Sequence, residues 1–544
     1  MSTEENTSTS VSYTRLVADD DVEDFDDAAK VDETSLLVDH STGNEDSNKN
    51  EKDSTNGVGA SYSEAVEASG FGKFHALLLI VCGWANMSDA VEILSVSFLL
   101  PDASVDMNIS SVEKGLLTSI IFVGMLVGGY LWGSLADVRG RRQILIYSLS
   151  CNAFFGAASS VCQNFWLFLF MRFLSGVGVG GSIPVIFSYF GEFQPNNHRG
   201  KMISALSTFW MAGNILTAGL AWAIIPREHL GYHNPDGFSY ESWRIFVAVC
   251  CIPAASSVLT FLLMPESPKF LLEQGNEEKS LDIMKKIYSW NHKGVKASDY
   301  PIDYLVPSSK DKQHTADGRK MTLRVQFGAL FMATKQLFKR PLTGITIAML
   351  VIIFNLSFGY YGLFMWFPEL FKRVENGGSA CSYFNESAVT NSTVPSDRIY
   401  VDGFFTSLSN LPGNLLTIFL MDKLSRKFLI TSSMIVSGIS VFFIWFLKTR
   451  IQVLIMSCVF GAISVITWNT LNVVGVELYP TSCRSTALGV QSVFNRMGAI
   501  LGNLMFGILI DLNCSVPMIL IAVLLAVGGF TALTLPNTSK KELK

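Results

Sequence analysis

The chain has few charged side chains for its length. Only 16% of its 544 residues are Asp, Glu, Lys or Arg, whereas about 25% is usual in soluble domains. Hydrophobic residues make up 49%, and Phe alone occurs 39 times. This balance excludes an ordinary soluble domain and favours a membrane protein. The N-terminal region also lacks a basic stretch followed by an apolar core, which argues against a secretory signal peptide.

Motifs of catalysis and of metal binding are missing as well. The nine cysteines show no spacing typical of a zinc site or a disulfide framework. The string "GVGVGG" at residues 176–181 lies inside an apolar run, where glycines serve helix packing rather than phosphate binding. We therefore expect no enzyme activity, no metal, no cofactor and no nucleic-acid partner.

An acidic segment precedes the first apolar run. Residues 1–70 hold 18 acids and four bases, with few aromatic side chains. Such a segment buries too little apolar surface to offset the entropy lost on ordering. We expect a disordered cytosolic tail over residues 1–72.

Twelve apolar runs follow, each near the length of about 20 residues that a helix needs to cross a bilayer. They lie near residues 75–99, 113–136, 143–161, 165–189, 201–225, 243–264, 342–367, 402–422, 428–447, 451–475, 484–508 and 514–535. This predicts an all-α membrane fold, with six-helix bundles over residues 73–264 and 342–535. A cytosolic linker over 265–341 and a cytosolic tail over 536–544 complete the chain. Lys and Arg gather in the loops of one side, which predicts that this side and both termini are cytosolic.

The two halves repeat each other. Five pairs share an offset of 285 positions: Asp137 with Asp422, Arg141 with Arg426, Glu192 with Glu477, Pro195 with Pro480, and Arg199 with Arg484. One offset with matching chemistry over several segments predicts two pseudo-symmetric halves.

Several stretches resemble known transporters. "GSLADVRGRR" and "PESPKFLLEQG" are similar to motifs of the major facilitator superfamily, the second to that of its sugar and organic-ion transporters. The strings "GVGVGGSIPVIFSYFGEF", "WAIIP", "SWRIFV", "SFGYYGL", "LPGNLL" and "ELYP" resemble the synaptic vesicle glycoprotein 2 family more closely. The resemblance covers residues 72–536 and implies a transporter fold in a vesicle or plasma membrane.

Two features depart from that family. Its members carry a long exoplasmic insertion between helices seven and eight, whereas this chain has a short loop there. That loop contains the sequons at Asn385 and Asn391, and Asn108 in the first exoplasmic loop is a third candidate for glycosylation. Where family members carry an acid in the tenth helix, this chain has Asn472, which weakens an interpretation restricted to cationic substrates.

A gating role is predicted for the repeated loop motifs. Gly133 would permit close helix approach, Asp137 would face a helix N-terminus across the two halves, and the arginines would bridge to acids. Breaking these contacts would accompany opening of the cytosolic side. The set comprises Gly133, Asp137, Gly140, Arg141, Arg142, Glu192, Arg199, Asp422, Arg426, Glu477 and Arg484. The alternative is that the basic residues serve only as topology signals.

Two acids interrupt the first apolar run, in "GWANMSDAVEIL". A charge at the bilayer centre costs roughly 2.5 to 3.5 kcal/mol on insertion scales, so Asp89 and Glu92 need a reason to be there. Their spacing puts both on one helix face. They suit proton coupling or binding of a substrate cation. The structural alternative is a permanent ion pair with an intramembrane base such as Arg172, Arg244 or Arg496.

Arg172 is the expected charge partner of the acids, and Arg496 is expected to face the central cavity. By resemblance, the helices that carry Trp210, Tyr360, Tyr361 and Trp468 line this cavity, together with Asn472. Aromatic rings with polar groups suit a sugar ring or an organic cation. Taken singly, an aromatic residue in a membrane helix more often faces lipid or anchors at the interface.

Two strings in the acidic tail resemble sorting signals. Tyr13 and Leu16 fit a tyrosine-based adaptor signal, and Asp32 with Leu36 and Leu37 fits an acidic dileucine. The sequence thus leaves two hypotheses. One is a proton-linked secondary transporter of a small polar organic solute, sugar-like or ionic. The other is a transporter-like vesicle protein that acts mainly in trafficking or exocytosis through partners such as adaptor proteins.

Overall fold

A computed structural model describes residues 59–232, 238–306, 334–377, 397–421, 423–447, 449–480, 483–513 and 515–536. The elements of the first half are α2 (Lys73–Asp106), α3 (Ser111–Arg139), α4 (Arg141–Ser160), α5 (Phe165–Glu192), α6 (Asn196–Ile224), η1 (Glu228–Leu230), α7 (Ser242–Cys250) and α8 (Ile252–Leu263). Those of the second half are α13 (Leu342–Phe364), α14 (Phe367–Gly377), α15 (Asp397–Met421), α16 (Arg426–Ile444), α17 (Arg450–Glu477), α18 (Arg484–Leu509) and α19 (Ser515–Ala532).

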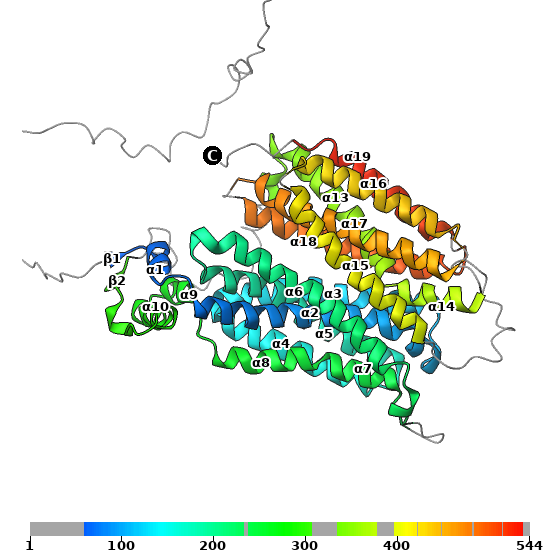
Figure 1. Ribbon diagram of the computed structural model, residues 1–544, viewed down its shortest axis with the longest axis horizontal. Helices are drawn as coiled ribbons and strands as arrows, with labels where there is room; N and C mark the ends of the chain where they lie inside the picture. The colour runs from blue at the N-terminus through cyan, green and yellow to red at the C-terminus, as the bar shows by residue number, and fades with distance from the viewer. Residues whose placement is uncertain are drawn as a thin grey trace, which may run out of the picture. The chain divides into compact units, whose positions relative to one another are not determined.

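Eleven spans of the described chain, with α7 and α8 counted as one, are long and apolar enough to cross a membrane. The twelfth long helix, α4, starts with a basic pair and carries several polar residues. The all-α membrane fold with two six-helix halves is confirmed, and Figure 1 shows the two groups of helices side by side. The internal repeat holds for the helix limits too. The first residues of α5 and α17 are 285 positions apart, and so are their last residues.

Local sequence sets the starts of these helices. Ser110 caps α3 through a capping box, in which its hydroxyl accepts from the Glu113 amide and the Glu113 carboxylate accepts from the Ser110 amide. Asn164 caps α5 by accepting from two backbone amides. The sixth span divides into α7 and α8 at Cys251, because Pro253 occupies the first turn of α8.

Close contact of α3 with α5 depends on glycine. A Cβ on Gly128 would lie 2.0 Å from the backbone oxygen of Val177, and one on Gly180 would lie 2.3 Å from that of Met125. These backbones can approach so closely only because a side chain is missing. The interpretation of "GVGVGG" as a packing element is therefore confirmed.

A small subdomain follows the first half at one end of the bundle. It contains α9 (Pro268–Glu273), α10 (Glu277–Asn291), η2 (Ala297–Asp299) and β2 (Tyr304–Leu305). The preceding chain joins it: β1 (Gly59–Ala60) pairs in parallel with β2, and the hydroxyl of Tyr300 donates to the carbonyl of Ala65 in α1 (Tyr62–Ala68) at 2.6 Å. The expectation of a disordered tail up to residue 72 is thus wrong for residues 59–72, because this segment buries its apolar side chains against α10.

The subdomain and α14 lie at opposite ends of the bundle (Figure 1). We call the end with α9 and α10 the linker end and the end with α14 the α14 end. Hydrogen bonds and ion pairs between the two halves gather at the α14 end, where α2 and α3 meet α14, α15 and α18.

Candidate functional site

Glu92 is held in a buried ion pair. Its Oε1 lies 2.6 Å from Nη1 of Arg172 on α5, and both side chains are almost completely buried. Ser175, one turn further along α5, donates to the same oxygen. The guanidinium of Arg172 also lies over the ring of Phe168, with 5.4 Å between Cζ and the ring centroid. The expected pairing of Arg172 with an acid of α2 therefore falls on Glu92, and this acid stabilises the first half.

Asp89 has a different environment one turn earlier on α2. Its Oδ2 accepts a hydrogen bond of 2.7 Å from Ser182, and its buried Oδ1 has no partner within the described residues. The cation whose charge acts on Asp89 is Arg496, which comes from α18 in the other half and is only partly buried. Asp89 is thus a buried carboxyl with one oxygen still available.

Arg244, the third candidate base, does not contact either acid. Its Nη2 lies 2.8 Å from Oδ2 of Asp106, and its guanidinium donates to the carbonyl of Cys162 and lies over the ring of Trp243. It fastens the α14 end of α2 to α7 and serves structure.

Three of the predicted aromatic residues form one cluster. The ring of Trp468 on α17 lies 6.1 Å from that of Tyr360 and 6.0 Å from that of Tyr361, between centroids. Tyr361 also contacts Phe122 of the first half at 4.9 Å and lies near Arg496. The indole Nε1 of Trp468 is buried without a partner in the described part of the chain. The charge of Arg496 interacts with both Tyr361 and Asp89, which relates the cluster to Asp89. The cluster also offers a hydrogen-bond donor.

Two predicted site residues lie apart from this cluster. Trp210 is partly buried on α6, and no ring contact found among the described residues joins it to the cluster. Asn472 on α17 is exposed. Sequence reasoning missed Ser182 and Asn214: the Oδ1 of Asn214 is buried and has no partner in the described chain. A repeat of small polar residues on α5 could have pointed to Ser182, whereas Asn214 carries no sequence signal.

The gating arginines contact acids within their own half. Arg141 Nε lies 3.2 Å from Oε1 of Glu192, and Arg426 pairs with Glu477 at the equivalent position of the second half. The prediction that such arginines bridge to Glu192 or Glu477 agrees with this geometry. The expectation that these contacts latch one half to the other does not, because neither pair crosses between halves here.

The other residues of the motif are placed as follows. A Cβ on Gly133 would meet no atom within 4 Å, so the prediction of close helix approach at Gly133 is wrong here. Gly140 has a φ of +100°, a conformation that favours glycine. The side chain of Asp137 is 78% exposed and lies 3.7 Å from Arg141. Arg142 donates to the carbonyls at the end of α8.

The structure describes only some of the remaining predicted residues. Arg199 is exposed, and Arg484 donates to the carbonyl of Tyr479 at 3.3 Å. Asn108 is exposed in the turn between α2 and α3. Outside the described residues lie Asp422, the sequons Asn385 and Asn391, and the sorting residues Tyr13, Leu16, Asp32, Leu36 and Leu37.

A charge network at the α14 end was not predicted. Glu369 of α14 lies 2.7 Å from Nζ of Lys114 on α3, and the two side chains are only 3% and 11% exposed. Arg373, one turn further on, lies 3.5 Å from Glu369 and 3.1 Å from Asp511 beyond α18. Further bonds between the halves run from Lys372 to the Pro101 carbonyl, from Ser97 to the Met365 carbonyl and from Tyr400 to Asp102. We call Lys114, Glu369, Arg373 and Asp511 the α14-end lock.

The lock keeps Glu369 ionised. Burial raises the pKa of this carboxyl, but the charges of Lys114, Lys372 and Arg373 outweigh burial, so its pKa lies below the ordinary value of 4.5. Lys372 is shifted in the same direction: burial lowers the pKa of its ammonium, although Glu369 opposes this. The network therefore contains a full negative charge at neutral pH.

Comparison with known proteins identifies the family. The sugar (and other) transporter family matches residues 77–544. The chain belongs to this family. Human synaptic vesicle glycoprotein 2C is 31% identical, with 89% of this chain and 81% of that protein covered. Mouse synaptic vesicle glycoprotein 2B is also 31% identical, over 89% and 86%. Rat synaptic vesicle glycoprotein 2A is 30% identical, over 89% and 80%.

Solved structures agree on the fold. The E. coli xylose transporter XylE in a partially occluded inward-open conformation matches with a TM-score of 0.64 at 16% identity, covering 88% of this chain and all of that one. A structure of the proton:xylose symporter XylE bound to 6-bromo-6-deoxy-D-glucose matches with a TM-score of 0.59 at 18% identity, over 88% and 97%. The resemblance to the synaptic vesicle glycoprotein 2 family and the major facilitator fold is confirmed. The chain is a multi-pass membrane protein of a transporter family and not an enzyme.

Proposed function

We propose that this chain is a secondary active transporter that carries a small hydroxylated solute and is driven by protons that bind Asp89. The observation that carries the proposal is the unequal environment of the two acids on α2. Glu92 is neutralised by Arg172, whereas Asp89 has one hydroxyl donor and a free buried oxygen. A buried carboxyl with no fixed cation can exchange a proton at low cost, and such groups mark proton paths in transporters.

Coupling needs a second group that responds to the proton. Arg496 fits this role, because it comes from the opposite half and its charge acts on Asp89. When Asp89 is ionised, attraction to Arg496 draws the two halves together at mid-membrane. Protonation removes that attraction, so the proton changes the relative free energy of the two conformations.

The cluster beside Asp89 suits a solute with hydroxyl groups. Tyr361 and Trp468 present ring faces, and the indole Nε1 of Trp468 and the amide Oδ1 of Asn214 lack partners in the described chain. A solute hydroxyl can accept from an indole N–H or donate to an amide oxygen, while aromatic faces pack against a sugar ring. Xylose and a glucose analogue are named for the matched symporter structures, which supports the same class of solute here.

The gathering of contacts at the α14 end supports alternating access. In this conformation the lock joins the two halves at that end, while the arginines of the linker end are paired within their own halves. We infer that the α14 end is shut and that access is from the linker end, which we place in the cytosol. Opening the other side would require the lock to break.

A second candidate is a role in vesicle trafficking. It is favoured by the relatives, which are named synaptic vesicle glycoproteins, and it places the chain in a vesicle membrane. In that case partners such as adaptor proteins would bind the N-terminal segment. The sorting residues concerned lie outside the described residues.

Purified protein in liposomes tests the transport proposal. An inward pH gradient should drive uptake of a sugar-like solute from a labelled panel, and Asp89→Asn should abolish this driven uptake. The matched control is the double variant Glu92→Gln with Arg172→Gln, which removes the neighbouring acid together with its cation and should leave gradient-driven uptake. Equal loss in both proteins would contradict a specific role for Asp89, and no uptake of any solute by the parent would favour the trafficking role.

A further inference from the structure

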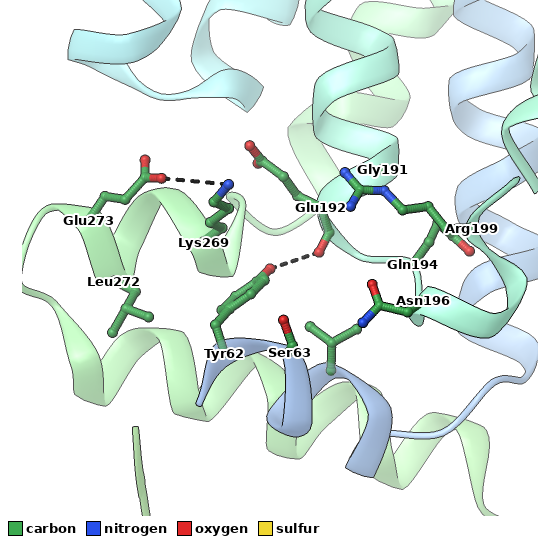
Figure 2. A pocket seen from close by; sticks show the side chains of 11 residues that line it. Tyr62, Ser63, Gly191, Glu192, Gln194, Asn196, Arg199, Lys269, Leu272 and Glu273 are labelled. Carbon is green, nitrogen blue, oxygen red and sulfur yellow. Dashed lines mark hydrogen bonds and ion pairs between the residues drawn. The ribbon is translucent and has the colours of Figure 1, made fainter. Parts of the chain in front are cut away.

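A cavity of about 230 Å³ lies at the linker end, where α5 ends and α6 begins. Its walls come from α1, from the junction of α5 with α6 and from α9 (Figure 2). The cavity is smaller than the roughly 300 to 1,000 Å³ typical of sites for drug-sized ligands. It therefore suits a small molecule or one headgroup, and it is separate from the Asp89 site in mid-membrane.

The acids of the cavity are already paired, whereas one of its cations is not. Glu192 is held by Arg141 and accepts from Ser267. Glu273 pairs with Lys269 (Figure 2), with 3.9 Å between Oε1 and Nζ. For the guanidinium of Arg199, no ion pair or hydrogen bond is found within the described residues, although Arg199 lines the cavity. The cavity thus offers a free guanidinium and a nearby ammonium to an anion.

Gln194 adds a second kind of contact. Its side chain lines the cavity and is only 3% exposed, yet neither its Nε2 nor its Oε1 has a hydrogen-bond partner in the described chain. Burying an amide without hydrogen-bond partners costs free energy. A ligand that supplies these partners removes this cost and therefore binds more tightly. A hydroxyl group can accept from the nitrogen and donate to the oxygen.

Tyr62 lines the cavity, and its phenol is neutral. Its hydroxyl donates to the carbonyl of Glu192 at 2.7 Å, as Figure 2 shows. Burial, and then the charge of Glu192, raises the pKa of this phenol well above its ordinary value, so it remains neutral. Its ring gives an apolar surface on which the carbon skeleton of a polyol can lie.

We propose that this cavity binds a small hydroxylated phosphate ester, with the phosphate at Arg199 and Lys269 and a hydroxyl at Gln194. Phosphate fits better than a monocarboxylate, because two cations can share a dianion and the guanidinium fork matches two phosphate oxygens. The same chemistry occurs in a soluble sugar phosphate and in the inositol headgroup of a membrane lipid. Such a ligand would join α1 to α9 and to the α5–α6 junction, and so would regulate the linker end of the transporter.

The test uses the full-length protein in phosphatidylcholine nanodiscs. Thermal unfolding is followed while inositol 1-phosphate, glucose 6-phosphate or unphosphorylated inositol is added, and in a separate arm phosphatidylinositol is included in the nanodisc. We expect a phosphate ester or phosphatidylinositol to raise the unfolding temperature, and unphosphorylated inositol to have no effect. A rise with phosphatidylinositol alone would identify the lipid as the source, and a rise with a soluble ester would identify a cytosolic metabolite.

Variants assign the effect to the cavity. Arg199→Gln should weaken binding about ten-fold or more, as expected for loss of a charged hydrogen bond. Lys201→Gln is the matched control, because Lys201 is exposed on the same helix and does not line the cavity. Gln194→Leu should weaken binding while raising the unfolding temperature of the ligand-free protein. Equal affinity in the Arg199 and Lys201 variants, or no response to any phosphate ester or to phosphatidylinositol, would overturn the proposal.

Discussion

Replacing Glu369 by Gln should shift the transporter away from the conformation seen here. The carboxylate is shared by Lys114 and Arg373 and is almost completely buried, so its loss leaves Lys114 as a buried cation without an anion. Removing one partner of a buried pair costs about 3 to 5 kcal/mol. We take the lower value, because the amide of Gln can still accept from Lys114 and Arg373 keeps Asp511. In a conformation with the α14 end open, water would solvate these charges, so the cost falls only on the shut conformation. About 3 kcal/mol corresponds to a shift in the conformational equilibrium of roughly a hundred-fold.

Pairs of spectroscopic labels measure this shift. Val112 at the start of α3 and Leu512 beyond α18 are exposed residues at the α14 end of opposite halves. The distance between labels at these sites should lengthen in the Glu369→Gln protein. Glu375→Gln is the matched control, since Glu375 lies on the same helix, is exposed and belongs to no ion pair found in the described chain. Identical distance distributions in the two variants would refute the lock.

The lock should also respond to acid. Because the pKa of Glu369 in the shut conformation is depressed, its stabilising contribution is present above the ordinary carboxyl value of 4.5 and is lost as the pH falls through the depressed value. The shut conformation should therefore persist through neutral and mildly acidic pH and give way only below that range. Label distances measured over a pH series in the Asp89→Asn protein, which lacks the proposed proton site, check this, and opening already at pH 6 would contradict the assignment to Glu369.

Three further predictions concern stability and coupling. Glu92→Gln alone should lower the free energy of unfolding by about 3 to 5 kcal/mol, because it leaves Arg172 buried and unpaired. Adding Arg172→Gln should recover most of this stability in thermal unfolding. A double variant no more stable than the single one would contradict the stabilising role of the pair. Gly128→Ala should destabilise by at least about 1 to 3 kcal/mol, since its Cβ would lie 2.0 Å from a carbonyl oxygen of α5, while Gly133→Ala should be neutral. Ser182→Ala removes the hydroxyl donor of Asp89 and should alter the pH dependence of uptake at unchanged unfolding temperature; an unchanged pH profile would exclude this coupling.

The architecture could be predicted from the sequence because it depends on local and repeated features. Long runs of apolar residues predict the membrane-spanning helices, and short charged motifs show the constant offset between the two halves. The lock could not be predicted in this way. Lys114 and Glu369 are 255 positions apart and each belongs to an ordinary-looking mixture of polar and apolar residues. Helix α1 could not be predicted for a related reason. A helix of seven residues is stable only through its contacts with the linker subdomain.

The sequence identified the two acids of α2 as candidate site residues but could not show which of them has a structural role and which a functional one. Both lie on one face, and three bases were available to neutralise them. Which acid meets Arg172 depends on how α5 packs against α2, and a tertiary contact of this kind cannot be derived from local sequence. The geometry gives Glu92 a permanent cation and leaves Asp89 with Ser182. The interpretation of a functional pair thus becomes one structural acid and one candidate for proton binding.

Uptake into liposomes under an imposed pH gradient shows whether Asp89 binds the coupling proton. Asp89→Asn should abolish gradient-driven accumulation, while exchange of labelled for unlabelled solute continues because the solute site is intact. The protein with Glu92→Gln and Arg172→Gln should still accumulate solute. Gradient-driven accumulation by Asp89→Asn at the parental rate would contradict the assignment of the proton to Asp89.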